Sequence, residues 1–129
     1  MIPAAAGPPA GAGATPPPDW ETLLASACSG EGLAAAYQPI IDTARGTVVG
    51  YEALARFPGY AEKNPEAWFS AARQHGKAAE LEAVALRTAL KARAELPANC
   101  FLTVNVSPEL LTTETIRSVW REEGKLGGL

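Results

Sequence analysis

The chain has 129 residues, enough for one domain and not for two. Its 14 acidic and 11 basic residues give a net charge of −3, and this mild balance argues against nucleic acid and acidic membranes as partners. Hydrophobic residues make up 47% of the chain, so a packed core is possible. No apolar run reaches the roughly 18 residues of a membrane-spanning helix, so we expect a cytoplasmic protein without a membrane span.

The two cysteines, Cys28 and Cys100, stand in no CxxC or Cys/His pattern. We expect both to be free thiols in a reducing compartment. The sequence gives no support for a zinc site, because His75 is its only histidine.

Residues 1–18 consist mainly of Pro, Ala and Gly and carry no charged side chain. They lack the basic start and the continuous apolar run of a signal peptide. Their prolines interrupt any regular helix or strand. We therefore predict a disordered leader over residues 1–18 and one folded unit over residues 19–129. Because the chain begins with Met1, we expect no further domain ahead of this leader.

The first predicted elements are a short helix and a pair of strands. Asp19 is suited to cap a helix over residues 20–28. Residues 34–42 and 47–57 are both predicted to be strands, and the second is rich in β-branched residues at its start. The short turn between them favours an antiparallel hairpin.

Two helices are predicted after the hairpin. Asn64 is suited to cap a helix over residues 65–74, with Pro65 at its first position. A longer helix is predicted over residues 77–96, ended by Pro97. Its apolar residues form one stripe at helical spacing, which consists of Ala79, Ala83, Leu86, Leu90 and Ala94.

A third strand is predicted to begin at Cys100 and to pass into a helix at Ser107 and Pro108, a good N-cap followed by a good first helical residue. A last helix is predicted over residues 113–123. The alternation of strands and helices in this half of the chain indicates an α/β fold with parallel strands.

Side chains alternate between the two faces of a strand, so Glu52, Leu54 and Arg56 are expected to share one face of the second strand. The third strand divides in the same way. One of its faces is apolar and suited to a helix layer, and it consists of Leu102, Val104 and Val106. The opposite face becomes polar toward the carboxyl end, and it consists of Thr103, Asn105 and Ser107.

A β/α barrel would explain this division, because residues at the carboxyl ends of its strands line the active site. Glu52 and Asn105 would then point inward and begin a site for a hard cation such as Mg²⁺. Arg56 could bind a phosphate in a bidentate manner, through two of its guanidinium N–H groups. The alternative is that Glu52 and Arg56 pair with each other at an exposed strand end. The residues alone leave both interpretations open.

Four segments occur in series with suitable spacing: YQPIID, GYEALARF, PEAWFSAA and FLTVNVSPELL. Together they resemble the amino-terminal part of the EAL domain family, whose tripeptide stands here as Glu52, Ala53 and Leu54. The resemblance covers about residues 20–129. It implies the amino-terminal portion of a modified TIM (β/α) barrel whose first strand is antiparallel to the others.

The resemblance also implies a function. Active members of the family are phosphodiesterases that hydrolyse the bacterial second messenger cyclic di-GMP to pGpG with two Mg²⁺ or Mn²⁺ ions, and members often form homodimers. Glu52 and Asn105 match metal ligands of the family. Arg56 matches an arginine that contacts a substrate phosphate, Leu54 a residue of the substrate groove, and Gln38 a glutamine near the bound nucleotide.

The resemblance is to part of a domain, because a complete barrel takes about 250 residues and eight strands. The paired aspartates, the lysine and the later glutamate of the family's site have no counterpart here. We therefore expect an incomplete and inactive fragment, whose stable folding on its own stays open. Three hypotheses remain: the front of a phosphodiesterase, a non-catalytic cyclic di-GMP receptor or protein-interaction module, and an unrelated α/β scaffold.

Overall fold

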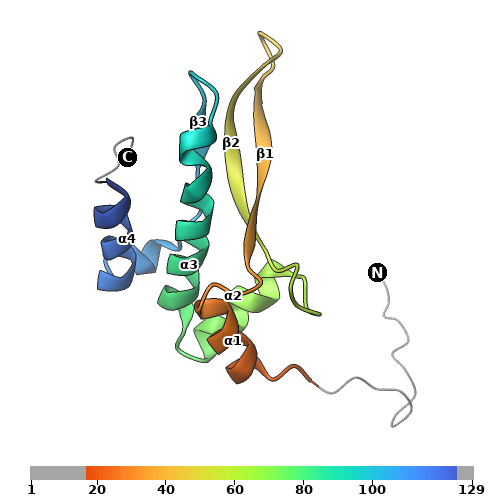
Figure 1. Cartoon of the computed structure of the whole chain (residues 1–129), viewed down its shortest axis with the longest axis vertical. Helices are drawn as coiled ribbons and strands as arrows, with labels where there is room; N and C mark the ends of the chain where they lie inside the picture. The colour runs from red at the N-terminus through yellow and green to blue at the C-terminus, as the bar shows by residue number, and fades with distance from the viewer. Residues whose placement is uncertain (1–16, 125–129) are drawn as a thin grey trace, which may run out of the picture.

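The computed structural model describes residues 17–124, in which three strands form one sheet beside four α-helices (Figure 1). The strands are β1 (Ala34–Asp42), β2 (Thr47–Arg56) and β3 (Phe101–Thr103), in the order β1-β2-β3. The expected leader lies outside the described residues except for positions 17 and 18, and so do residues 125–129 at the other end.

The first two strands form the predicted antiparallel hairpin. Its turn is held by Asp42, whose carboxylate accepts the backbone N–H groups of Ala44 and Arg45 at 3.0 and 3.3 Å. Gly46 closes the turn at a φ of +68°, a conformation that favours glycine. The chain therefore returns with Gln38 directly opposite Glu52 in the register.

The first two helices begin where they were predicted to begin. In α1 (Trp20–Cys28), the Asp19 carboxylate accepts the N–H of Thr22. In α2 (Pro65–Gln74), the side-chain oxygen of Asn64 accepts the N–H of Glu66. Each cap satisfies a backbone donor that has no partner inside the helix.

The third helix is shorter than predicted. α3 covers Ala78–Leu90, and the chain continues as a 3₁₀-helix, η1, over Lys91–Glu95. A 3₁₀ segment has three residues per turn, so it does not continue the spacing of the apolar stripe. Ala94, predicted to lie in that stripe, is therefore exposed. Ala83, Leu86 and Leu90 of the same stripe are buried as expected.

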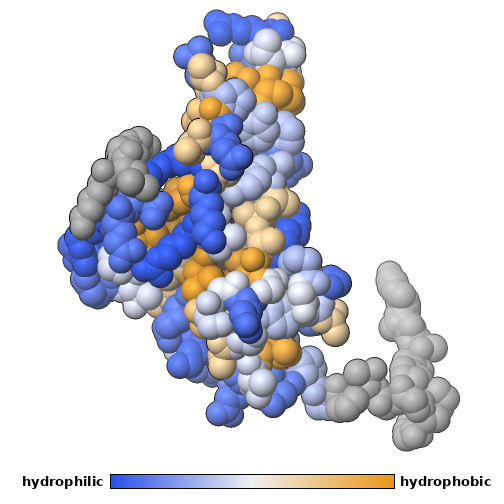
Figure 2. Space-filling model, in the orientation of Figure 1, coloured by the Kyte–Doolittle hydropathy of each residue, from blue (hydrophilic) through white to orange (hydrophobic). Residues whose placement is uncertain are grey.

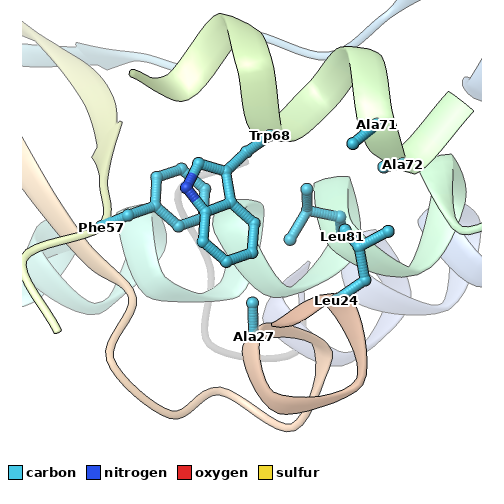
Figure 3. Close-up of a cluster of buried hydrophobic side chains, with 7 residues drawn as sticks. All are labelled: Leu24, Ala27, Phe57, Trp68, Ala71, Ala72 and Leu81. Carbon is cyan, nitrogen blue, oxygen red and sulfur yellow. The ribbon is translucent and has the colours of Figure 1, made fainter. Parts of the chain in front are cut away.

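The larger of two cores lies where α1 and α2 meet the end of β2, and we call it the aromatic cluster (Figure 3). Phe57 stacks on Trp68 with ring centroids 4.5 Å apart and planes 3° apart. The indole N–H of Trp68 donates to the carbonyl of Glu62 at 3.0 Å, so its one polar group is satisfied. The buried members are Leu24, Ala27, Phe57, Trp68, Ala71, Ala72 and Leu81.

The second core joins α3 to α4 (Glu114–Gly124) beneath the third strand. Its buried members are Ala83, Leu86, Leu90, Ile116 and Val119. Leu102, Val104 and Val106 pack against it, which confirms the predicted apolar face of the third strand. Trp120 also packs against this core.

β3 is parallel to β2 but pairs with it only from Gly50 to Glu52. A Cβ atom on Gly50 would lie 2.7 Å from both the ring and the carbonyl oxygen of Phe101, so glycine permits this close approach. The ring of Phe101 is itself 49% exposed. Further apolar surface appears near the tip of the hairpin in Figure 2, where Ile41 and Val48 are 50% and 39% exposed.

Candidate functional site

The two faces of the sheet differ in what covers them. The hydroxyl of Tyr37 donates to the carbonyl of Ala89 in α3 at 3.0 Å, which places Tyr37 on the helix side. Gln38, the next residue, therefore lies on the opposite face with its register partner Glu52. We call this second face the open face, because within residues 17–124 its side chains at Gln38, Arg56 and Asn105 are exposed.

Glu52 and Asn105 meet on the open face. The side-chain amide of Asn105 donates to a carboxylate oxygen of Glu52 at 3.2 Å. Glu52 is a residue of β2, while Asn105 lies two residues beyond the end of β3. The parallel pairing of these strands, which ends at Glu52 and Thr103, brings the two residues together. A carboxylate and an amide oxygen are donor types that a hard cation prefers.

Arg56 lies apart from Glu52 on the same face. The two residues are four positions apart, and a strand extends about 13 Å over that distance. The guanidinium of Arg56 donates to the carbonyl of Ala55 at 2.9 Å, and no ion pair joins it to Glu52 in the described part of the chain. The alternative in which Glu52 and Arg56 neutralise each other is therefore wrong for this structure.

Leu54 separates these two charged residues and lies opposite Ala36 of β1. Gln38 extends the polar row on the other side of Glu52. Across the sheet the order is Gln38 on β1, Glu52 on β2 and then Asn105 after β3. The five residues predicted as site residues thus share one face, and their binding roles stay predictions.

A cavity lies beside the open-face residues, between β2 and residues 104–107, which follow β3. Its volume is about 490 Å³. Leu54, Arg56 and Asn105 line it on one side and Phe69 and Arg73 on another. It lies at the carboxyl ends of β2 and β3, the end at which barrel enzymes carry their sites, and its two guanidinium groups suit an anionic ligand.

The sequence analysis did not single out Glu82, a residue of α3 that also lines the cavity. Its buried carboxylate accepts the backbone N–H of Ser107 at 2.7 Å and the Ser107 hydroxyl at 2.5 Å. The sequence did contain a signal for this buried carboxylate. Glu82 stands one turn before Leu86, on a helix face that is otherwise apolar.

The prediction for Ser107 is correct in position, because Ser107 is the N-cap of η2 (Pro108–Leu110) and Pro108 is its first residue. However, η2 is only a three-residue 3₁₀-helix, and the Ser107 side chain makes no capping bond. Its side chain also does not continue the open face, because the regular strand ends at Thr103 and Glu82 bonds Ser107 from the helix side. The buried carboxylate needs hydrogen-bond donors, and Ser107 supplies two.

The donor set for a metal ion is partial. In residues 17–124 no three His, Cys, Asp or Glu side chains lie close enough together to hold an ion. Glu52 and Asn105 supply two oxygen-bearing side chains that fit Mg²⁺ or Mn²⁺, and an octahedral ion would need about four further oxygens. No described helix is long and apolar enough to cross a membrane.

A family model described as the EAL domain matches residues 22–123. The search of curated proteins found no match. Among solved structures, the 1.55 Å crystal structure of the Xanthomonas citri FimX EAL domain in complex with c-diGMP has 22% identity and a TM-score of 0.67. The match covers 83% of this chain and 43% of that chain, so this chain spans less than half of its relative.

The likeness and the sheet topology agree on the fold. It is an α/β fold, the amino-terminal portion of a modified TIM (β/α) barrel with an antiparallel first strand. An unrelated α/β scaffold is thereby excluded. The chain belongs to the EAL domain family.

Proposed function

We propose that this chain is the amino-terminal part of a cyclic di-GMP phosphodiesterase, and that its open face supplies part of the site that hydrolyses cyclic di-GMP to pGpG. The observation that carries the proposal is the contact between Glu52 and Asn105, at the point where the pairing of β2 with β3 ends. Membership of the EAL family, and a similar fold in an EAL domain in complex with c-diGMP, support this choice of ligand.

Each site residue has a role in this proposal. Glu52 and Asn105 hold a divalent cation, Mg²⁺ or Mn²⁺, which when bound offsets the negative charge of a phosphate group. Arg56 is exposed and has no carboxylate partner in the described residues, so its guanidinium is available to orient a phosphate. Gln38 and Leu54 contact the nucleotide from the same face.

The 129-residue chain by itself is proposed to bind without hydrolysing. Two protein oxygens leave most of the coordination shell of Mg²⁺ to water, and such a site is weak. Within the described residues no group of three or more His, Cys, Asp or Glu side chains forms that could hold an ion and its attacking water. Hydrolysis, and any homodimer, would then require a complete domain.

A receptor that binds cyclic di-GMP without hydrolysing it is the second candidate. The observation that favours it is the cavity, because Arg56 and Arg73 line it and can bind phosphate without a metal ion. The two candidates differ in whether nucleotide affinity depends on a divalent cation.

Isothermal titration calorimetry of the 129-residue chain with Mn²⁺ and with cyclic di-GMP tests the proposal. We expect Glu52→Gln to abolish Mn²⁺ binding and Arg56→Ala to weaken cyclic di-GMP binding by about tenfold or more, the value of a charged hydrogen bond. Arg45→Ala is the matched control, because Arg45 is an exposed arginine of the hairpin turn.

The outcomes separate the candidates. Equal cyclic di-GMP affinity in the wild type and in Arg56→Ala contradicts the proposed phosphate contact. Affinity that is unchanged by EDTA and by Glu52→Gln favours the receptor. Conversion of cyclic di-GMP to pGpG by the 129-residue chain, followed by anion-exchange chromatography, contradicts its proposed inactivity.

A further inference from the structure

Glu82 is the one charged side chain among the described residues that is buried, with 8% of its surface exposed. A carboxylate is costly to bury unless hydrogen-bond donors replace its water. Both oxygens of Glu82 have such donors, and one residue supplies them: Oε1 accepts the Ser107 N–H and Oε2 accepts the Ser107 hydroxyl. The carboxylate therefore fixes the backbone and the side chain of Ser107 together.

Ser107 lies in a segment that the sheet does not hold. Ladder pairing between β2 and β3 ends at Glu52 and Thr103, and residues 104–107 continue without a strand partner. Val104 and Val106 pack against the second core, which fixes their distance from α3. Apolar packing sets no direction along the chain, whereas the two hydrogen bonds at Ser107 fix the register of the segment against α3.

Asn105 lies in the middle of this segment, between the two valines. Its side chain is exposed and donates to Glu52 at 3.2 Å. A slip of the segment would move Asn105 along the open face and break this contact. The position of Asn105 is thus held from two sides, by the β2–β3 pairing that ends at Thr103 and by the bonds of Ser107 to Glu82 of α3.

We propose that Glu82 is a positioning residue: by holding Ser107, it keeps Asn105 beside Glu52. For the cation site this inference rests on the proposed function. Both Glu82 oxygens are occupied by Ser107, so Glu82 acts through Asn105 and is not itself a ligand. The role requires two acceptor oxygens on one side chain, and glutamine has only one because its other terminal atom is an NH₂ donor.

Nuclear magnetic resonance of the 129-residue chain tests the inference without any ligand. The readout is the side-chain amide of Asn105, and Glu52→Ala supplies its reference spectrum in the unpaired state. In Glu82→Gln we expect the Asn105 amide to shift toward that reference, and the Ser107 N–H to exchange about tenfold faster or more. Ser107→Ala is the second variant, because it removes one hydrogen bond and leaves a small side chain.

Glu80→Gln is the matched control. Glu80 stands two residues earlier on α3, with its carboxylate 3.8 Å from the ammonium of Lys77, and makes no contact with Ser107 among the recorded hydrogen bonds of the described residues. We expect this variant to leave the Asn105 amide unchanged. An equal shift in Glu80→Gln and Glu82→Gln would mean that loss of charge on α3 is sufficient, and would overturn the inference.

Mn²⁺ affinity is the second readout, by electron paramagnetic resonance of free Mn²⁺. We expect Glu82→Gln and Ser107→Ala to bind Mn²⁺ several-fold more weakly than the wild type. If the wild type binds no Mn²⁺, the cation part of the proposed function fails, and the Asn105 amide still decides the inference. An Asn105 amide that keeps its wild-type resonance in both variants overturns the positioning role.

Discussion

The aromatic cluster and the open face meet along one strand, because alternate residues at the end of β2 contribute to each of them. Ala55 and the adjoining Phe57 face the helices and pack in the cluster. Glu52 and Arg56 face the other way, with polar groups accessible for binding. The pleat of β2 thus separates the residues that stabilise the fold from those that are available for chemistry.

This separation means that the two regions should respond differently to substitution. Trp68 and Phe57 have 0% and 1% of their surfaces exposed, so truncation there leaves a cavity. Gln38, Arg56 and Asn105 on the open face are exposed, so their truncation should hardly change the free energy of unfolding. Three predictions test this contrast.

The largest effect is expected for Trp68→Ala. Removal of this ring deletes its stacking on Phe57 and its edge contact with Trp20, and we expect a loss of about 3–5 kcal/mol in the free energy of unfolding. Urea denaturation followed by circular dichroism measures it. Gln38→Ala on the open face is the control, with an expected change within about 0.5 kcal/mol. Similar losses in the two variants would contradict the separation.

A middle-sized effect is expected for Gly50→Ala, which tests the close approach of β3 to β2 on the side of the open face. The added methyl group would lie 2.7 Å from the ring and the carbonyl oxygen of Phe101, and we expect a loss of about 1–3 kcal/mol. Because the oxygen belongs to the backbone, Phe101→Ala should not restore stability in the double variant. Full restoration by the second substitution would show that only the ring limits the approach of β3.

The smallest effect is expected from acid. Hydrogen bonds from Thr22 lower the pKa of Asp19, and the bond and charge of Arg121 lower the pKa of Glu114. A carboxylate with a lowered pKa in the folded state stabilises the fold above its unfolded pKa of about 4, and the contribution is lost as the pH falls through the folded value. The double variant Asp19→Asn, Glu114→Gln should therefore flatten the dependence of stability on pH below about pH 5. An unchanged slope contradicts these two pKa directions.

Much of this fold could be predicted from local signals. Asp19 and Asn64 are N-cap residues that stand directly before their helices. The short turn that ends at Gly46 brings β1 and β2 together, so each strand pairs with its neighbour in the sequence. The alternation that placed Glu52 on the open face follows from strand geometry alone. Such features depend on neighbours in the sequence, so a pattern is sufficient to find them.

The missed features depend on distant partners. Ser107 has the composition of an N-cap, yet its hydroxyl bonds Glu82, which stands 25 positions earlier. Local propensity could not anticipate that a buried carboxylate would compete for it. The end of α3 was missed for a related reason, because Pro97 marks where a helix must stop and does not exclude an earlier change to a 3₁₀-helix.

The antiparallel pairing of β1 with β2 has a consequence for the order in which the strands associate during folding. The chain reaches β2 from β1 through a tight turn, and a hairpin of this kind forms in about 1–10 μs. β3 is parallel to β2 and can pair only after residues 57–100 have crossed over with α2 and α3. We therefore expect the hairpin to form before β3 docks, so that Glu52 is in place on its strand before Asn105 arrives beside it.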